Sequence, residues 1–328
     1  VQSIIFASMS GSALADAAAS GKLMQSLMTR DGKYTPAYAA ALTCASSVLG
    51  PIIPPSIPLV LYALVSDTSI GYLFLGGVVP GLLLGAVQIA LIAFTARRRR
   101  FPVEEKVPLR ELPGITWRAM PALLMPVILL GCLYSGITTP TEAAAVAALY
   151  ALLVSAFLYR SVRPKDVYRS LATSARVTTS IGMLIAGALV FNFVITAENI
   201  PKTLSAMMKA HEMSPLAFLL FVNVLLIVLG CFLEGTTIIL IILPVLLPTA
   251  QALGVDPVHF GMIMILNLGI GLITPPVGPT LFVGCAIGKV TMEQVSKELW
   301  PFYGAMCVAL LMVTYIPAIS LWLPGLAK

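Results

Sequence analysis

Long apolar runs, each about as long as a bilayer is thick, are the feature that most constrains how this chain can fold. A transmembrane helix needs about 20 mostly apolar residues. Hydrophobic residues make up 59% of the 328 residues and charged residues only 10%, which is too little polar surface for a soluble globule of this size. The sequence therefore predicts an all-α, polytopic membrane protein surrounded by lipids. Five runs reach the required length: residues 70–96, 119–136, 141–159, 177–197 and 301–323.

The positive charges lie between these runs and indicate the topology. Lys and Arg concentrate on the cytoplasmic side of membrane proteins. If the basic segment 97–118 is cytoplasmic, 17 of the 20 Lys and Arg residues fall on that side. The net charge of +6 is thereby explained by topology, and we expect no nucleic-acid partner.

Two similar stretches interrupt long apolar runs: "GPIIPPS" at 50–56 and "GLITPPVG" at 271–278. A proline inside a helix removes one N–H donor and clashes with the carbonyl four residues before it. Each Pro-Pro pair should therefore unwind a turn and leave backbone carbonyls without helical partners. Such groups are costly in hydrocarbon unless something satisfies them, and a desolvated cation would do so. The alternative is that Pro and Gly merely kink these helices.

A polar segment precedes each interruption at a similar distance. "GSALAD" begins at Gly11, 39 residues before Gly50, and "GCFLEGTT" begins at Gly230, 41 residues before Gly271. We interpret the two segments as tips of re-entrant helical hairpins. The charge pattern predicts that the first hairpin enters the membrane from the cytoplasmic side and the second from the external side. Such opposite entry is typical of inverted repeats. The predicted domains are a first transport-domain repeat (1–96), a cytoplasmic linker (97–118), scaffold helices and an arm (119–213), and a second repeat (214–328).

Unwound carbonyls together with hydroxyls from a hairpin tip would form two oxygen cages suited to Na⁺. The first cage would combine Ser8, Ser10, Gly11 and Ser12 with Gly50, Ile53 and Pro55. The second would combine Gly230, Thr236 and Thr237 with Gly271, Thr274 and Val277.

Three acids fall within apolar segments, where a carboxylate is costly and marks a candidate functional site. Glu234 lies in the second tip, where it could bind substrate or balance cations. We expect Asp16 to cap or stabilise the second arm of the first hairpin, and Glu142 to cap a helix. His211 and His259 stand alone, so we expect them to face solvent.

Five motifs together resemble the large membrane subunit of tripartite ATP-independent periplasmic (TRAP) transporters: "GSALADAAASG", "GPIIPPSIPLVLYA", "SIGYLFLGGVVPGLLLG", "GITTPTEAAAVAALYALL" and "GLITPPVGPTLFVGCAIG". The resemblance implies an elevator-type secondary transporter in the bacterial inner membrane, without nucleotide hydrolysis. It implies Na⁺-driven import of an organic acid such as a C4-dicarboxylate or sialic acid. It also implies two partners, a small four-helix membrane subunit and a periplasmic substrate-binding protein. The family's helices before the first hairpin are missing here, so we expect an amino-terminal truncation.

The resemblance also assigns site residues. The first Na⁺ site falls on Ser8, Gly11, Gly50, Ile53 and Pro55, to which the cage adds Ser10; the second falls on Gly230, Gly271, Thr274 and Val277. Substrate contacts fall on Ser12, Ser56 and Glu234, with Thr236 beside the last. Many members have Asp where this chain has Glu234.

Three other functions remain open at this point. A standalone Na⁺/carboxylate symporter would need no binding protein, and a passive channel would show no coupling to Na⁺. An intramembrane enzyme would use Asp16 and Glu234 as a carboxylate pair, but no motif places these acids at one scissile bond. We therefore expect a transporter and not an enzyme.

Overall fold

The computed structural model describes residues 2–32, 34–99, 101, 108, 111–210 and 213–327. Within these residues the chain consists of helices and short connections. The elements in chain order are α1 (Gln2–Ser10), α2 (Ala13–Thr29), the 3-10 turn η1 (Arg30–Gly32), α3 (Pro36–Ser47), α4 (Ile57–Ser66), α5 (Ile70–Arg99), α6 (Leu112–Tyr134), α7 (Pro140–Leu153), the π-helical segment η2 (Val154–Leu158), α8 (Pro164–Ala197), α9 (Ile200–Ala210), α10 (Pro215–Gly230), α11 (Gly235–Ala252), α12 (Pro257–Gly271), α13 (Pro279–Gly288), α14 (Met292–Tyr315) and α15 (Ala318–Leu326).

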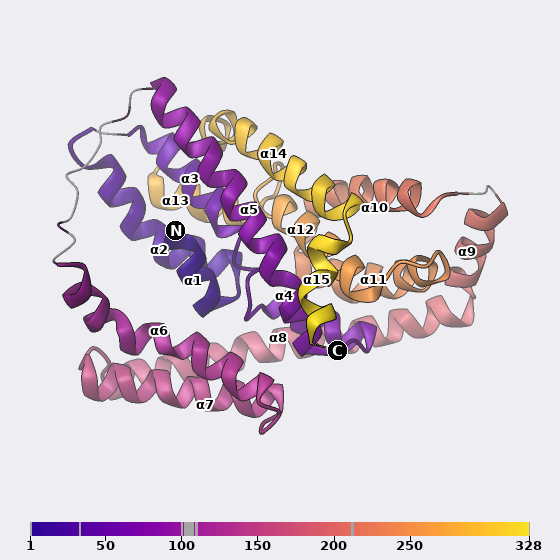
Figure 1. Cartoon of the computed structure of the whole chain (residues 1–328), viewed down its shortest axis with the longest axis horizontal. Helices are drawn as coiled ribbons and strands as arrows, with labels where there is room; N and C mark the ends of the chain where they lie inside the picture. Colours follow the sequence, from indigo (N-terminus) through magenta and orange to yellow (C-terminus); the bar gives the residue numbers. More distant parts are fainter. Residues whose placement is uncertain are drawn as a thin grey trace. The chain divides into compact units, whose positions relative to one another are not determined.

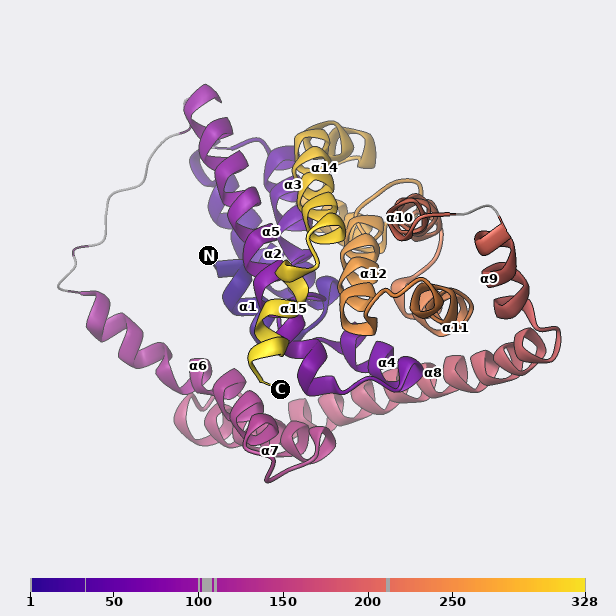
Figure 2. The same cartoon turned by 45° about the vertical axis from the view of Figure 1, so that its right-hand side comes forward.

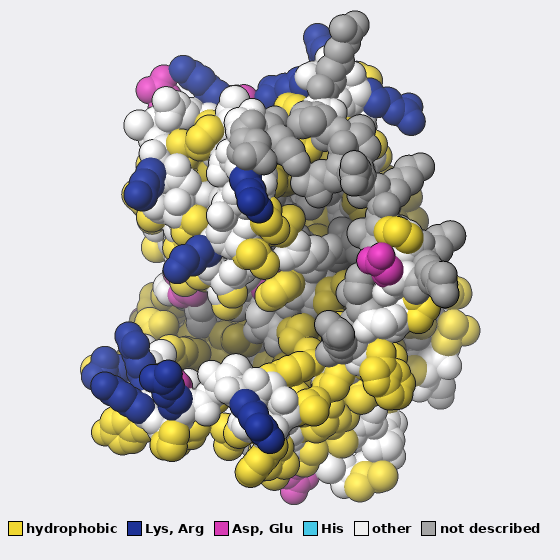
Figure 3. Space-filling model, turned by 90° about the vertical axis from the view of Figure 1, so that its left-hand side faces the viewer, with side chains coloured by type: hydrophobic (Ala, Val, Ile, Leu, Met, Phe, Trp, Pro, Cys, Tyr) yellow, Lys and Arg dark blue, Asp and Glu magenta, His cyan; other side chains and the backbone are white. Residues whose placement is uncertain are grey.

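Several helices are long and apolar enough to cross a bilayer, which confirms the predicted all-helical, multi-pass membrane protein. In the described part of the chain these are Ile70–Arg99, Pro140–Leu158, Pro164–Ala197, Gly235–Ala252 and Met292–Tyr315. Large apolar side chains are widely exposed, as Figure 3 shows for one face. Exposed apolar surface on this scale indicates contact with a partner or with lipid.

The chain forms two compact units, one from residues 1–102 and 191–328, the other from residues 103–190. In the smaller unit α6 packs against α7, and the Tyr150 hydroxyl donates to the Pro121 carbonyl at 2.8 Å. The predicted cap at Glu142 is confirmed, because its carboxylate accepts from the Thr139 N–H at 2.8 Å in a capping box.

In the larger unit the same order of elements occurs twice. A helix pair (α1–α2), an interrupted helix (α3 and α4) and a long helix (α5) come first; a pair (α10–α11), an interrupted helix (α12 and α13) and a long helix (α14) follow (Figures 1 and 2). Both predicted interruptions are therefore present, as are the two turns at which the hairpin tips were predicted. The two Pro-Pro peptide bonds, Pro54–Pro55 and Pro275–Pro276, are both cis.

Each series packs reciprocally against the other. The half-helix after each interruption contacts the second arm of the opposite pair: α4 against α11, and α13 against α2. Likewise α3 contacts α14, α12 contacts α5, and the two long helices contact each other. At the centre a Cβ on Gly269 would lie 2.6 Å from a Val48 methyl. These residues precede Gly271 and Gly50 by the same two positions, so the two interrupted helices cross where they begin to unwind.

The last apolar run differs from the prediction of one span over 301–323. The Thr291 side chain caps α14 in a capping box with Gln294, so the helix starts earlier than predicted. It ends at Tyr315, because a residue that precedes proline, here Ile316, is disfavoured in helical conformation. A second helix, α15, follows Pro317. The predicted 301–323 boundary is therefore wrong at both ends.

The prediction that His259 faces solvent is wrong. The residue is buried, and its Nδ1 lies 3.3 Å from the Ser320 Oγ. A single histidine in the sequence gave no indication of that partner, which α15 supplies. His211 lies outside the described residues. The basic segment begins as helix, since α5 continues to Arg99. Residues 100, 102–107, 109 and 110 of the predicted linker also lie outside the described part.

Candidate functional site

The first interruption, residues 48–56, leaves backbone carbonyls unclaimed. The N–H groups of Ile52 and Ile53 turn back to the Leu49 carbonyl at 3.1 and 2.9 Å. Among the described residues no donor reaches the carbonyls of Gly50, Ile53 or Pro55. These are the three interruption residues predicted to bind the first cation. The Gly50 carbonyl lacks a helical donor because Pro54 has no N–H. The N–H groups that would reach Ile53 and Pro55 in a helix bond instead to the Gly11 carbonyl and the Ser56 hydroxyl.

The first tip lies directly against this interruption. Gly11 joins α1 to α2 with φ of +63°, and its carbonyl accepts from the Ile57 N–H at 3.2 Å. A Cβ on Gly11 would come within 2.5 Å of the Pro55 oxygen and 3.2 Å of the Ser56 Cα. Only glycine allows both this backbone conformation and this close approach. The structure thus brings Gly11, Pro55 and Ser56 together.

Asp16 does not cap α2, one of the two roles that the sequence predicted for it. Ser12, not Asp16, caps α2, since its Oγ accepts from the Ala15 N–H at 3.4 Å. The Asp16 carboxylate is 1% exposed; its Oδ1 accepts from the Ser10 hydroxyl, and its Oδ2 has no hydrogen-bond partner in the described structure. A Cβ on Gly50 would lie 2.8 Å from Oδ2.

Ionised, this carboxylate would give the first interruption a negative charge beside its free carbonyls. A buried carboxylate oxygen without a partner is unfavourable, and a cation next to Oδ2 would offset that cost. The signal in the sequence was an acid inside an apolar segment. It could not indicate that the carboxylate points to Gly50 instead of capping its own helix.

The other residues predicted for this region have identifiable structural partners. Ser8 donates its hydroxyl to the Ile5 carbonyl at 2.7 Å within α1. Ser56 is 1% exposed and caps α4: its hydroxyl donates to the Pro51 carbonyl and accepts from the Leu59 N–H at 3.2 Å. Each hydroxyl oxygen keeps acceptor capacity for a further ligand.

At the second tip, too, backbone lies directly against backbone. A Cβ on Gly271 would lie 2.6 Å from the Gly230 Cα, so neither glycine can be replaced without displacement of the chain. The Val277 N–H donates to the Cys231 carbonyl at 3.2 Å, which repeats the bond between Ile57 and Gly11. Gly230, Gly271 and Val277 are therefore brought together, as the sequence predicted.

The second interruption, residues 272–278, has more of its carbonyls occupied. The Gly271 oxygen accepts from the Thr274 N–H at 3.0 Å, and the Leu272 oxygen from the Thr280 N–H at 3.1 Å. The Ile273 oxygen accepts from the Tyr303 hydroxyl at 2.7 Å. The Thr274 hydroxyl donates to the Ile270 carbonyl at 2.7 Å. The Thr274 carbonyl accepts no hydrogen bond in the described part of the chain.

The residues predicted to bind substrate occupy helix starts at the tips and interruptions. Ser12 and Ser56 cap α2 and α4. Glu234 is exposed at the start of α11, and its Oε1 accepts from the Thr236 hydroxyl at 2.6 Å. The amino-terminal ends of helices carry partial positive charge and free N–H groups, which favour anions.

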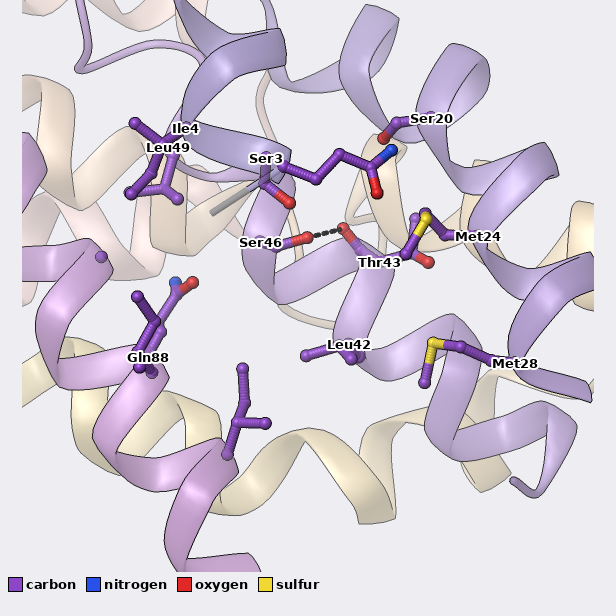
Figure 4. Close-up of a pocket in the computed structure, with 14 residues that line it drawn as sticks. Ser3, Ile4, Ser20, Met24, Met28, Leu42, Thr43, Ser46, Leu49 and Gln88 are labelled. Atoms are coloured by element: carbon purple, nitrogen blue, oxygen red, sulfur yellow. Dashed lines mark hydrogen bonds between the residues drawn. The ribbon is translucent and has the colours of Figure 1, made fainter. Parts of the chain in front are cut away.

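A cavity of about 250 Å³ lies beside the first interruption, between α1, α2, α3 and α5 (Figure 4). Its wall reaches Leu49, the residue before Gly50, and includes the polar side chains of Ser20, Thr43, Ser46 and Gln88. The Ser46 hydroxyl donates to the Thr43 carbonyl at 3.2 Å, and the Gln88 amide donates to the Ala45 carbonyl at 2.8 Å. The space is large enough for several waters.

The donor atoms gathered here are hard oxygens. The described residues contain no group of three or more His, Cys, Asp and Glu side chains placed to hold a metal ion. Backbone carbonyls, hydroxyls and one carboxylate suit hard cations, whereas soft thiolate and imidazole ligands suit transition metals. The residues present therefore fit Na⁺ in chemical type.

Comparison with known proteins places this geometry in a family. The pattern of the tripartite ATP-independent periplasmic transporter DctM component matches residues 1–319. The chain is 43% identical to a C4-dicarboxylate TRAP transporter large permease of Pseudomonas aeruginosa, over 98% of this chain and 75% of the relative. It is 39% identical to the sialic acid TRAP transporter large permease of Vibrio cholerae, over 99% of this chain and 76% of the relative.

A third relative, the isethionate TRAP transporter permease protein DctMQ of Oleidesulfovibrio alaskensis, is 40% identical over 98% of this chain and 51% of the relative. All three relatives are named as permeases, which confirms that the protein is a transporter and not an enzyme. Its matched length, its helices and its named relatives agree: the chain belongs to the DctM family of TRAP transporter large permease components.

Proposed function

We propose that this chain is the membrane-spanning permease of a Na⁺-coupled importer for a small organic acid. The observation that carries the proposal is the first interruption, where the unpartnered Asp16 Oδ2 lies against Gly50 beside free carbonyls of Gly50, Ile53 and Pro55. A dehydrated Na⁺ ion would satisfy these groups together. Such groups would otherwise be costly in the membrane interior.

A second Na⁺ site at the other interruption follows from the same backbone design. The Thr274 carbonyl is unclaimed there, and the Thr274 hydroxyl keeps acceptor capacity although it donates to Ile270. Gly230 and Val277 complete the same arrangement of tip against interruption that occurs at Gly11 and Ile57. One cage with a carboxylate and one neutral cage would couple uptake to the Na⁺ gradient.

The two series of helices would form inverted repeats that move together as a transport domain. Every contact between the series described above has its counterpart when α1 to α5 are exchanged for α10 to α14. A pseudo-two-fold axis in the membrane plane requires this reciprocity. Transport would then proceed by an elevator movement of this domain, with the hairpins re-entrant from opposite sides.

The substrate would be an organic anion held at the helix starts. The relatives are named for C4-dicarboxylate, sialic acid and isethionate, all of them anionic. Ser12, Ser56, Glu234 and Thr236 lie at the starts of α2, α4 and α11, where N–H groups and helix dipoles favour an anion. Bound Na⁺ would further offset the substrate charge.

TRAP large permeases work with a small membrane subunit and a periplasmic binding protein. We propose both as partners of this chain in the bacterial inner membrane. The test is uptake by the full-length permease in liposomes, with its small subunit and with or without the binding protein. Uptake that requires both the binding protein and a Na⁺ gradient supports the proposal. Uptake of free substrate without the binding protein indicates a standalone symporter, and uptake independent of Na⁺ contradicts the coupling.

A further inference from the structure

Tyr303 of α14 reaches into the second interruption from outside it. Its hydroxyl donates to the Ile273 carbonyl at 2.7 Å. In a continuous helix that carbonyl would accept from the Val277 N–H, but this donor is directed to Cys231 at 3.2 Å. The Tyr303 hydroxyl therefore takes the place of the Val277 N–H, which the interruption redirects to Cys231.

This bond decides which oxygen of the interruption is left for a ligand. Backbone donors occupy the carbonyls of Gly271 and Leu272, and Tyr303 occupies that of Ile273. The next carbonyl, that of Thr274, accepts no bond in the described structure. The bond also holds the peptide unit between Ile273 and Thr274, because the Ile273 carbonyl and the Thr274 N–H belong to that unit.

At the first interruption, no hydroxyl of the described residues donates to the corresponding carbonyl, that of Ile52. Tyr303 is the twelfth residue of α14, and the twelfth residue of α5 is Gly81. A Cβ on Gly81 would lie 2.6 Å from the Ile53 Cγ1, and Ile53 follows Gly50 by three residues as Thr274 follows Gly271. The counterpart of the Ile273 carbonyl is that of Ile52, whose oxygen would clash with a Cβ on Gly77. Close packing against the backbone of α5 thus takes the place that Tyr303 has in the second half.

From this geometry we infer that Tyr303 is a positioning residue for the second Na⁺ site: its hydroxyl holds the Ile273 carbonyl and so directs the Thr274 carbonyl and hydroxyl to the ion. The inference rests on the proposed Na⁺ coupling. It assigns to Tyr303 no contact with substrate. Loss of the Tyr303 hydroxyl should therefore lower the affinity for Na⁺ and leave the substrate KM and the maximal rate at saturating Na⁺ unchanged.

The test is Tyr303→Phe in the full-length permease with its partner subunits, assayed by uptake at varied Na⁺. Phenylalanine keeps the ring, which packs edge-on against Trp300 at 6.0 Å between ring centroids. We expect the half-saturating Na⁺ concentration to rise about three- to tenfold, as for one lost hydrogen bond, with the maximal rate and substrate KM at saturating Na⁺ within about twofold of wild type.

The matched control is Tyr315→Phe on the same helix, a tyrosine that is 41% exposed; it should leave Na⁺ dependence unchanged. A second measurement does not depend on transport and can be made even if the variant transports poorly. It follows the rise in the thermal unfolding temperature as NaCl is added. A shift of this titration to higher Na⁺ in Tyr303→Phe alone supports the inference. Wild-type Na⁺ affinity in both assays overturns it, whereas absence of Na⁺ dependence in the wild type contradicts the proposed function itself.

Discussion

The two interruptions share a backbone design but differ in what surrounds them. Around residues 48–56 the chain is almost fully buried, a carboxylate oxygen of Asp16 faces Gly50, and Ser56 caps the half-helix that follows. Around residues 272–278 the chain is more open: Val277 is 40% exposed, and Gly278 offers no side-chain cap to α13.

This difference indicates how one device can give two unequal cation sites. A buried carboxylate next to free carbonyls would bind a cation mainly through charge, which acts more strongly in a buried region than in water. Neutral carbonyls and a hydroxyl in a more open region would bind through geometry, which depends on neighbours such as Tyr303. We therefore expect the Na⁺ affinity of the first site to fall more on loss of its charge than on loss of a neutral group. At the second site we expect the loss of a single hydroxyl to lower the Na⁺ affinity.

The largest effect is expected where the second tip touches its interruption. Gly271→Val would place side-chain atoms in the Gly230 backbone, since even a Cβ would lie 2.6 Å from the Gly230 Cα. We expect Na⁺-dependent uptake to be abolished and the free energy of unfolding to fall by about 1–3 kcal/mol. Gly304→Ala is the control, because nothing lies within 4 Å of a Cβ there. Uptake near the wild-type rate in Gly271→Val would contradict this close packing.

Removal of the charge at the first interruption comes next. Asp16→Asn keeps the shape and an acceptor for Ser10 but removes the negative charge beside Gly50. The half-saturating Na⁺ concentration should rise about tenfold or more, because interactions with a charged group are the stronger kind. Na⁺-dependent uptake measures it, with Asp67→Asn at an exposed left-handed position as control. Equal Na⁺ affinity in the two variants would show that Asp16 serves only the hairpin.

A smaller change is expected from one hydroxyl at the second interruption. Thr274→Val removes an oxygen that also donates to the Ile270 carbonyl at 2.7 Å. The half-saturating Na⁺ concentration should rise about threefold to tenfold. Thr173→Val removes the same kind of bond, to the Arg169 carbonyl at 2.9 Å, from an exposed helix and should have no effect. A matching response of both variants would count against the second site.

The smallest effect concerns the cap that only the first interruption has. Ser56→Ala removes the bonds to Leu59 and Pro51 and should lower the free energy of unfolding by about 1–2 kcal/mol. Thermal or denaturant unfolding in detergent checks it, with Ser214→Ala at the exposed cap of α10 as control. A loss no larger than that of the control would mean that burial adds nothing to this cap.

The backbone design could be predicted from the sequence because it depends on residue types with one dominant physical effect. Proline excludes regular helix and glycine permits turns and close approaches in almost any context. The prolines concerned are Pro54, Pro55, Pro275 and Pro276, and the glycines are Gly11 and Gly271. Both interruptions and both tips therefore lie where the sequence placed them. The assignment of individual ligands remains a prediction.

The side chains around the interruptions could not be predicted in the same way. Asp16 was predicted to cap or stabilise the second arm of the first hairpin, because sequence spacing gives no direction for a carboxylate in space. Tyr303 and His259 find their partners on other helices, at Ile273 and Ser320. Such contacts depend on how helices cross, and a single sequence does not specify that crossing.

The most direct test is a high-resolution cryo-EM map of the full-length permease with its partner subunits in NaCl, compared with one in choline chloride. We expect compact non-protein density in NaCl alone at both interruptions, against the Asp16 Oδ2 and the Gly50 carbonyl in the first and the Thr274 carbonyl in the second. Identical maps, with these oxygens bonded to protein or to ordinary water in both salts, would contradict it.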